Sequence, residues 1–173
     1  LSHLAVALGV EPSIILDFFN EPLTNMTLLH YPVSSSKSEN SGIHPHKDIS
    51  AITILHPDPL GGLEIRTRKG EWLEILCPPE ALLVNIGDFM EVWSGGRFIS
   101  TPHRVSNRNQ RSRYSAPYFS VPRHSTLVKP LVKYENSFKH REILVGEVST
   151  EVWRTNWPDE NPSESGYQLG AIN

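Results

Sequence analysis

One short segment of this sequence places an imidazole beside a carboxylate. We predict that residues 42–48, which contain His46 and Asp48, open an extended strand. Side chains two residues apart share a face of an extended chain, so His46 and Asp48 would project together while Lys47 points away. An imidazole nitrogen and a carboxylate oxygen side by side supply two of the ligands of a divalent metal site.

A third metal ligand would have to come from a distant part of the chain, and His103 is the candidate. Pro102 precedes it and restricts the backbone, and an apolar strand follows. Two histidines and one carboxylate leave open positions on a metal ion, which suits iron(II) that must bind a co-substrate and oxygen together. Because the chain has eight histidines, a solvated polar turn is the alternative interpretation of the His-x-Asp pattern. His44 is the rival ligand, two residues before His46, and a role behind the metal ligands stays open for it.

Arg113 and Ser115 open another predicted strand. The same two-residue spacing puts the guanidinium and the hydroxyl on one face, where they could form a charge-assisted clamp for a carboxylate. A surface charge is the alternative for Arg113. Its phase along the strand argues against that alternative, because it matches the phase of three residues that look interior, namely Pro117, Phe119 and Val121.

The elements that must position these residues are mostly short strands. Runs rich in β-branched and aromatic residues alternate with turn residues. The predicted strands are 27–31, 50–56, 63–67, 72–76, 81–86, 98–100, 104–106 and 113–121. Such strands, with no helices between them, favour a sandwich, a jelly roll or a barrel. Residues 85–88 are interpreted as a structural turn between strands, in which Asp88 bonds to backbone.

Helices are predicted at both ends of the strand region. Helical spacing of apolar residues predicts a helix over 1–8, capped by Gly9, and a second helix from Pro12 to Phe19. A further helix is predicted over 140–153, with Ile143 and Leu144 on its apolar side, and residues 159–166 look like a solvated tail. The predicted organisation is a single domain over 1–173, with a helical lead-in at 1–26, a strand core at 27–131 and a C-terminal helix and tail at 132–173.

Composition excludes several classes of protein. The chain has 173 residues, of which 38% are hydrophobic and 20% charged, so it can bury the core of one globular domain. The formal net charge of −3 argues against a nucleic-acid-binding surface, and no apolar run is long enough to span a membrane. Cys77 is the single cysteine and no secretory signal is visible, so we expect a reducing, cytoplasmic compartment. The oligomeric state is not indicated.

Several motifs occur together in a fixed order between residues 28 and 131. They are Leu29-His30-Tyr31-Pro32, His46-Lys47-Asp48, Gly61-Gly62-Leu63-Glu64-Ile65, Gly70-Glu71-Trp72, Asn85-Ile86-Gly87-Asp88, Gly96-Arg97-Phe98, Ser100-Thr101-Pro102-His103-Arg104-Val105 and Arg113-Tyr114-Ser115. In this order and at these spacings the chain resembles the iron(II)- and 2-oxoglutarate-dependent dioxygenases, in the group that includes isopenicillin N synthase. The resemblance covers the C-terminal catalytic domain of that family.

The resemblance implies a fold, a site and cofactors. The fold is mainly β, a double-stranded β-helix or jelly roll, with short helices at the N-terminal and C-terminal ends. His46, Asp48 and His103 are implied as the catalytic iron ligands, and Arg113 and Ser115 as the clamp on the distal carboxylate of 2-oxoglutarate. The implied cofactors are Fe(II), 2-oxoglutarate as co-substrate and O2, and ascorbate could help in vitro.

This sequence also departs from the family pattern. Tyr31 matches a tyrosine that reaches the co-substrate in some members, but Leu29 stands where plant members carry asparagine. Lys47 replaces a small hydroxyl residue, which matters little if it points outward. Full-length members have a long region before the first helix, and we expect this chain to lack it.

The implied activity is that of an oxidoreductase acting on a small organic molecule. It would couple decarboxylation of 2-oxoglutarate to succinate and CO2 with hydroxylation, or with desaturation or ring closure in a different substrate pose. Ile43, Leu55 and Phe119 are candidates for the pocket wall. Two alternatives stay open, namely an iron oxidase of the same fold that needs no 2-oxoglutarate, and a non-catalytic metal-binding jelly-roll module.

Overall fold

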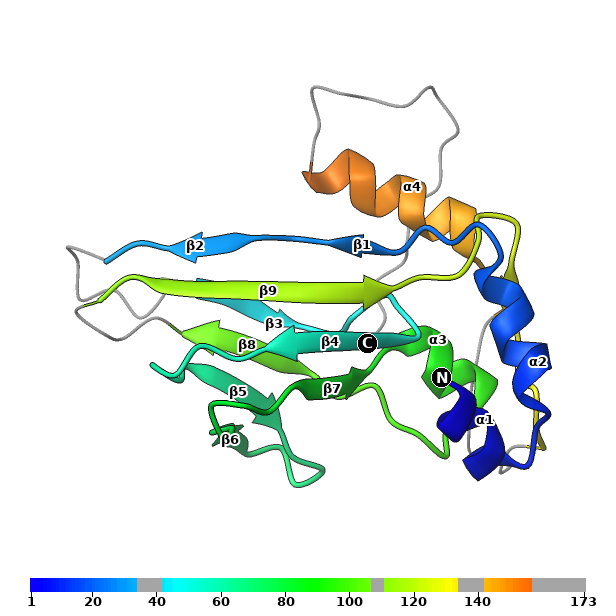
Figure 1. The fold of residues 1–173 in the computed structure, drawn as a ribbon, viewed down its shortest axis with the longest axis horizontal. Helices are drawn as coiled ribbons and strands as arrows, with labels where there is room; N and C mark the ends of the chain where they lie inside the picture. The colour runs from blue at the N-terminus through cyan, green and yellow to red at the C-terminus, as the bar shows by residue number, and fades with distance from the viewer. Residues whose placement is uncertain (34–41, 107–110, 134–141, 157–173) are drawn as a thin grey trace.

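The computed structural model describes residues 1–33, 42–106, 111–133 and 142–156. Its described part is built from antiparallel strands with a few short helices, as predicted. Two sheets face each other in the manner of a jelly roll, and the helices α1, α2 and α3 gather at one end of them (Figure 1). Among the described residues, none of the helices has the length and apolar character that crossing a membrane requires.

The larger sheet is organised around one long strand. Its strands are β1 (Asn25–Met26), β2 (Leu29–Tyr31), β4 (Ile52–His56), β7 (Leu83–Ile86) and β9 (Arg113–Ser120). The order is β1-β9-β4-β7, and β2 also pairs with β9. Because paired residues of antiparallel strands face the same way, the inner residues form rows across the sheet. One such row joins Asn85, Thr53 and Phe119.

The smaller sheet has the order β3-β8-β5-β6. Its strands are β3 (Gly42–His46), β5 (Leu63–Arg66), β6 (Trp72–Glu74) and β8 (His103–Ser106). Ile43 pairs with Val105 and His46 with His103, so β3 advances three residues where β8 advances two. The extra residue is a β-bulge, which changes the phase of the side chains along β3.

The hydrophobic core lies at the helical end of the sheets. The helices are α1 (Ser2–Leu8), α2 (Pro12–Leu16), the 3-10 helix η1 (Asp17–Phe19), α3 (Asp88–Trp93) and α4 (Val145–Asn156). Trp93 is fully buried, and its ring stacks on Phe18 at 5.2 Å between centroids. Phe89, Met90 and Ile15 are fully buried in the same cluster. Packing at this end leaves the space between the sheets for the pocket described below.

The predicted elements are confirmed in most places and wrong in three. The N-terminal helices form, and Gly9 ends α1 in the left-handed conformation at φ 72°. Residues 98–100 are not a strand, and the predicted turn at 85–88 is instead the end of β7, Gly87 and the first residue of α3. Ile143–Leu144 is not helical but forms β11, which pairs with β10 (Leu127–Val128), so α4 begins only at Val145. The predicted polar loop at 34–41 and the tail at 159–166 lie outside the described residues.

The buried Trp93 gives a test of where stability resides. We expect Trp93→Ala to lower the free energy of unfolding by about 3–5 kcal/mol, because it leaves a cavity against Phe18. Trp72 is the control, since it is only partly buried and lies under the Arg104 guanidinium at 4.3 Å. Trp72→Ala should cost about 1 kcal/mol. Urea denaturation followed by circular dichroism measures both, and equal losses would contradict this location of the core.

Candidate active site

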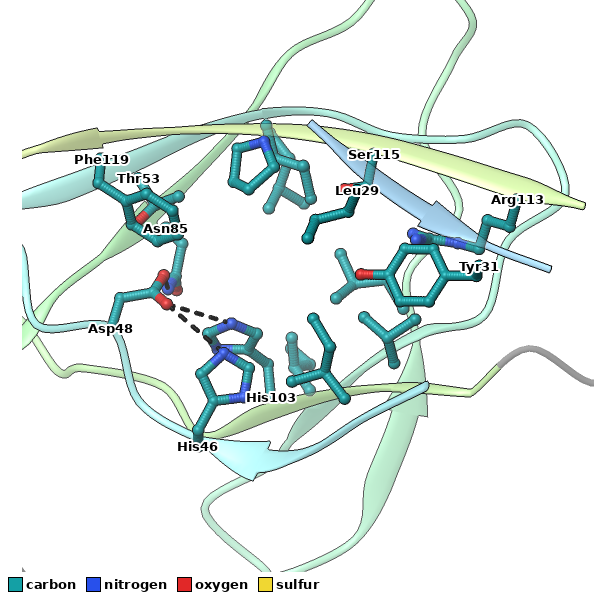
Figure 2. Close-up of a pocket in the computed structure, with 17 residues that line it drawn as sticks. Leu29, Tyr31, His46, Asp48, Thr53, Asn85, His103, Arg113, Ser115 and Phe119 are labelled. Carbon is teal, nitrogen blue, oxygen red and sulfur yellow. Dashed lines mark hydrogen bonds and ion pairs between the residues drawn. The ribbon is translucent and has the colours of Figure 1, made fainter. Parts of the chain in front are cut away.

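A single pocket between the two sheets contains all six residues singled out by the sequence. Strands of both sheets line it, and Figure 2 shows His46, Asp48 and His103 at one end and Arg113 and Tyr31 at the other. Ser115, on β9, also lines this pocket. The remaining lining is almost entirely apolar and comprises Leu29, Ile43, Leu55, Leu63, Ile65, Leu83, Val105, Pro117 and Phe119, together with the polar Thr53 and Asn85. Ile43, Leu55 and Phe119 therefore line the pocket, as expected.

The three predicted metal-binding side chains converge. Pairing of β3 with β8 puts His46 opposite His103, and their ring centroids are 4.2 Å apart. The Oδ1 atom of Asp48 lies 3.7 Å from Nε2 of His46 and 3.5 Å from Nε2 of His103. One ligand atom from each residue lies within 4.8 Å of the other two. Among the described residues this is the only such group of histidine, cysteine and acidic side chains.

The local path of the chain differs from the prediction for Asp48. The strand β3 ends at His46, so Asp48 does not share a strand with it but lies just beyond the end. The bulge lets both Ile43 and His46 face the pocket, although they are three residues apart. His44 is exposed and does not belong to the cluster, but its carbonyl oxygen lies 2.8 Å from Nδ1 of His46. His44 therefore supports the site from its backbone.

The second nitrogen of each histidine ring is held by a backbone carbonyl. The Nδ1 atom of His46 donates to the His44 carbonyl, and that of His103 donates to the Thr101 carbonyl at 3.1 Å. A proton on Nδ1 leaves the lone pair of Nε2 directed at Asp48, where a metal ion can use it. Burial and the neighbouring His103 lower the pKa of His46 below its ordinary 6.5, outweighing the opposite effects of the His44 carbonyl and Asp48. Its imidazole is therefore neutral at neutral pH, as a metal ligand must be.

Asn85 is the functional residue that sequence reasoning missed. The sequence places it in a structural turn, but it lies on β7 facing the pocket, and its Nδ2 donates to Oδ2 of Asp48 at 2.8 Å. This bond turns Oδ1 of the buried carboxylate toward the two histidines. Alternation along the predicted strand 81–86 could have found Asn85, because it is in phase with the pocket-lining Leu83.

The backbone at Asp48 is anchored by the first turn of α3. The N–H groups of Asp88 and Phe89 donate to the carbonyls of Asp48 and Ser50, at 2.9 and 3.1 Å. Asp88 thus acts through its own N–H at the start of a helix, not through a side chain bonded to backbone in a turn. Burial raises the pKa of the Asp88 carboxyl, against the lowering effects of Ser100 and Lys47. Lys47 points away from the pocket, with Nζ 3.0 Å from Glu91 Oε2.

The opposite end of the pocket carries a buried positive charge. Arg113 is 1% exposed, and its Nε donates to the Gly61 carbonyl at 2.8 Å. Its Nη1 is buried without a hydrogen-bond partner in the described structure, so the site can accept an anionic group there. The Tyr31 ring lies 4.9 Å from the guanidinium carbon. Burial raises the pKa of the Tyr31 hydroxyl, and Arg113 opposes that shift.

This donor set fits a metal ion and an organic dianion together. Two imidazole nitrogens and one carboxylate oxygen form the donor set of non-haem iron(II) sites that keep open positions. Arg113 and Ser115 line the same pocket, and a guanidinium and a hydroxyl are groups that can donate hydrogen bonds to a carboxylate. Most of the side chains that line the pocket between the two ends are apolar.

Comparisons with known proteins agree with this geometry. A family model described as the 2OG-Fe(II) oxygenase superfamily matches residues 23–122. The chain is 37% identical to scopoletin 8-hydroxylase of Arabidopsis thaliana over an alignment of 142 residues. That alignment covers 80% of this chain and 39% of the relative. It is 32% identical over 143 residues to 2-oxoglutarate-dependent dioxygenase 11 of Oryza sativa subsp. japonica, covering 81% and 40%.

Solved structures of similar fold lead to the same family. A full-length Neurospora crassa protein in complex with alpha-KG and thymine superposes with a TM-score of 0.76 at 26% identity, over 88% of this chain and 50% of that one. A putative 2OG-Fe(II) oxygenase family protein from Caulobacter crescentus gives a TM-score of 0.74 at 31% identity, over 88% and 52%. This chain therefore spans about two fifths of the length of the curated relatives and about half of the solved ones.

The contact of Asn85 with Asp48 predicts an effect on metal affinity. We expect Asn85→Ala to weaken binding of Fe(II), or of Mn(II) as a redox-stable substitute, by about 10- to 100-fold, because Oδ2 of Asp48 loses its donor. Asn25→Ala on β1 is the control, since Asn25 is exposed, does not line the pocket, and its side-chain amide donates to the Leu23 carbonyl. Calorimetric titration measures both variants. An unchanged affinity in Asn85→Ala would show that the hydrogen bond does not orient the carboxylate.

Proposed function

Because this chain belongs to the 2OG-Fe(II) oxygenase superfamily, we propose that it binds Fe(II) and 2-oxoglutarate and oxidises a small organic molecule. The observation that carries this proposal is that one pocket holds both halves of the required site. Three converging metal-ligand side chains lie at one end, and a buried arginine whose Nη1 has no hydrogen-bond partner among the described residues lies at the other.

In this proposal the iron ligands are His46, Asp48 and His103, the residues that would also be essential for catalysis. Nε2 of each histidine and Oδ1 of the aspartate would bind the metal, because these atoms already face one another. The carbonyls of His44 and Thr101 would hold the two rings in orientation. A site held in this way needs little rearrangement when the metal ion binds.

The co-substrate would lie between the metal ligands and Arg113. Arg113 and Ser115 would bind the distal carboxylate of 2-oxoglutarate, and Tyr31 would line the same end. When bound, iron(II), oxygen and 2-oxoglutarate supply the oxidising chemistry, with decarboxylation of the keto acid to succinate and CO2. The protein's own contribution is to orient the keto acid along the pocket and to keep water from it.

The class of substrate follows from the relatives only in outline. The name of scopoletin 8-hydroxylase and the thymine complex of the Neurospora crassa protein associate those two proteins with small organic molecules. We therefore propose a small organic substrate here as well, with hydroxylation as the default reaction. Desaturation or ring closure would need a different pose of the substrate over the same metal site.

Two other functions are distinguished by the same experiment. An iron oxidase that needs no 2-oxoglutarate would turn over its substrate without forming succinate. A non-catalytic jelly-roll module would bind metal without consuming the keto acid. Turnover with Fe(II), ascorbate and 2-oxoglutarate, screened over a panel of small molecules, should yield succinate in proportion to oxidised product. Product without succinate, or no decarboxylation with any compound, would contradict the proposal.

The role of Arg113 gives a quantitative prediction. Arg113→Ala should raise the 2-oxoglutarate concentration needed for half-maximal succinate formation by roughly 10- to 100-fold, because it removes charge-assisted hydrogen bonds worth about 1.5–3 kcal/mol. Arg104→Ala is the matched control. Arg104 pairs with Glu64 at 2.8 Å and does not line the pocket. An unchanged requirement in Arg113→Ala would exclude its proposed role.

A further inference from the structure

Asp58 joins two segments that are far apart in the sequence. It lies in the loop 57–62 between β4 and β5, and its Oδ1 accepts a hydrogen bond from the Leu60 N–H at 2.8 Å. Its Oδ2 accepts a second hydrogen bond from the Tyr114 N–H, also at 2.8 Å, at the start of β9. The carboxylate therefore fixes this loop against the residue that follows Arg113.

The same loop carries the Gly61 carbonyl, which is the backbone group that binds Arg113. The Gly61 N–H donates to the Asp58 carbonyl at 3.0 Å, and the Gly61 carbonyl accepts from Nε of Arg113 at 2.8 Å. Gly61 has φ +75°, which glycine adopts without strain. A side chain at Gly62 would also collide with the Ser106 carbonyl, so the loop has little room to shift. Asp58 therefore helps to fix the Gly61 carbonyl, together with the contacts of Gly62 with Glu74 and Ser106.

The Nε contact determines which way the guanidinium faces. With Nε bound to Gly61, Nη1 stays buried and has no hydrogen-bond partner among the described residues. An arginine side chain that is free to rotate loses conformational entropy when it binds a carboxylate, and this loss weakens binding. An arginine whose side chain is already fixed by the protein does not pay this cost again when the carboxylate binds. Asp58 itself does not line the pocket, so any effect on a ligand there must pass through residues that do, and Arg113 is the one that the Gly61 carbonyl contacts.

We propose that Asp58 is a positioning residue for Arg113, and that its contacts with Leu60 and Tyr114 set the affinity of the pocket for the distal carboxylate of the co-substrate. The effect on 2-oxoglutarate rests on the proposed function. The positioning of the Arg113 side chain rests only on the hydrogen bonds from Asp58 through Gly61.

A pair of keto acids tests the proposal. 2-Oxopentanoate has the carbon chain of 2-oxoglutarate with a methyl group in place of the distal carboxylate. In calorimetric titrations of the Mn(II)-loaded protein without oxygen, Asp58→Ala should weaken 2-oxoglutarate binding by about 10-fold. Binding of 2-oxopentanoate should not change, because it lacks the distal carboxylate that Arg113 would bind. Asp58→Asn keeps one acceptor oxygen and should show an intermediate loss for 2-oxoglutarate.

Two further variants separate positioning from a general loss of structure. In an Arg113→Ala background, adding Asp58→Ala should have no further effect on 2-oxoglutarate binding, since both changes act through one side chain. Glu64→Ala removes a carboxylate that likewise accepts two hydrogen bonds, from Arg104, and should leave both keto acids unaffected. Equal weakening of both keto acids by Asp58→Ala, additivity with Arg113→Ala, or unchanged 2-oxoglutarate binding would overturn the proposal.

One measurement needs no co-substrate and keeps the two proposals separate. The Arg113 Nε–H proton should exchange slowly with water in the wild-type protein and clearly faster in Asp58→Ala, as nuclear magnetic resonance can follow. Equal exchange rates would overturn the positioning role whatever the protein binds. A wild-type protein that binds neither keto acid, but shows the difference in exchange, would contradict the proposed function while leaving Asp58 as the residue that positions Arg113.

Discussion

The antiparallel pairing of β3 with β8 is the constraint on which the site depends. It brings His46 opposite His103 across two strands that are distant in the sequence. The bulge before His46 then turns that ring into the space between the sheets while Ile43 keeps its place on the pocket wall. Without this register the two imidazoles could not share a metal ion, since a slip of one residue would turn one of them to the opposite face of its sheet.

Each end of the pocket is held by a different anchor. At the metal end, the first N–H groups of α3 fix the loop that carries Asp48, and Asn85 fixes its carboxylate. At the other end, Asp58 and the Gly61 carbonyl hold the Arg113 side chain. The packed core around α1, α2 and α3 lies outside the pocket, at one end of the sheets. The inner faces of the sheets are thereby left for ligands, and the helical end supplies stability.

Sequence periodicity predicted the residues whose positions follow from local geometry. Alternation along β9 placed Arg113 and Ser115 on an interior face, and both line the pocket. The bulge in β3 and the end of that strand at His46 were not predicted, because both are set by pairing with β8. β11 was not predicted for the same reason. Its apolar residues fit the helical pattern of the segment that follows, and its strand conformation comes from pairing with β10. Asn85 and Asp58 were missed for a related reason, since their roles come from partners 37 and 56 residues away.

The central claim is that Nε2 of His46, Oδ1 of Asp48 and Nε2 of His103 bind one metal ion. Anomalous diffraction from crystals of the Mn(II)-loaded protein tests it most directly, because the method locates the ion independently of activity. The account predicts one strong peak within bonding distance of all three atoms, with its remaining coordination positions open toward the apolar pocket. A peak bound to other residues, or the absence of any ion between these three side chains at saturating Mn(II), would contradict it.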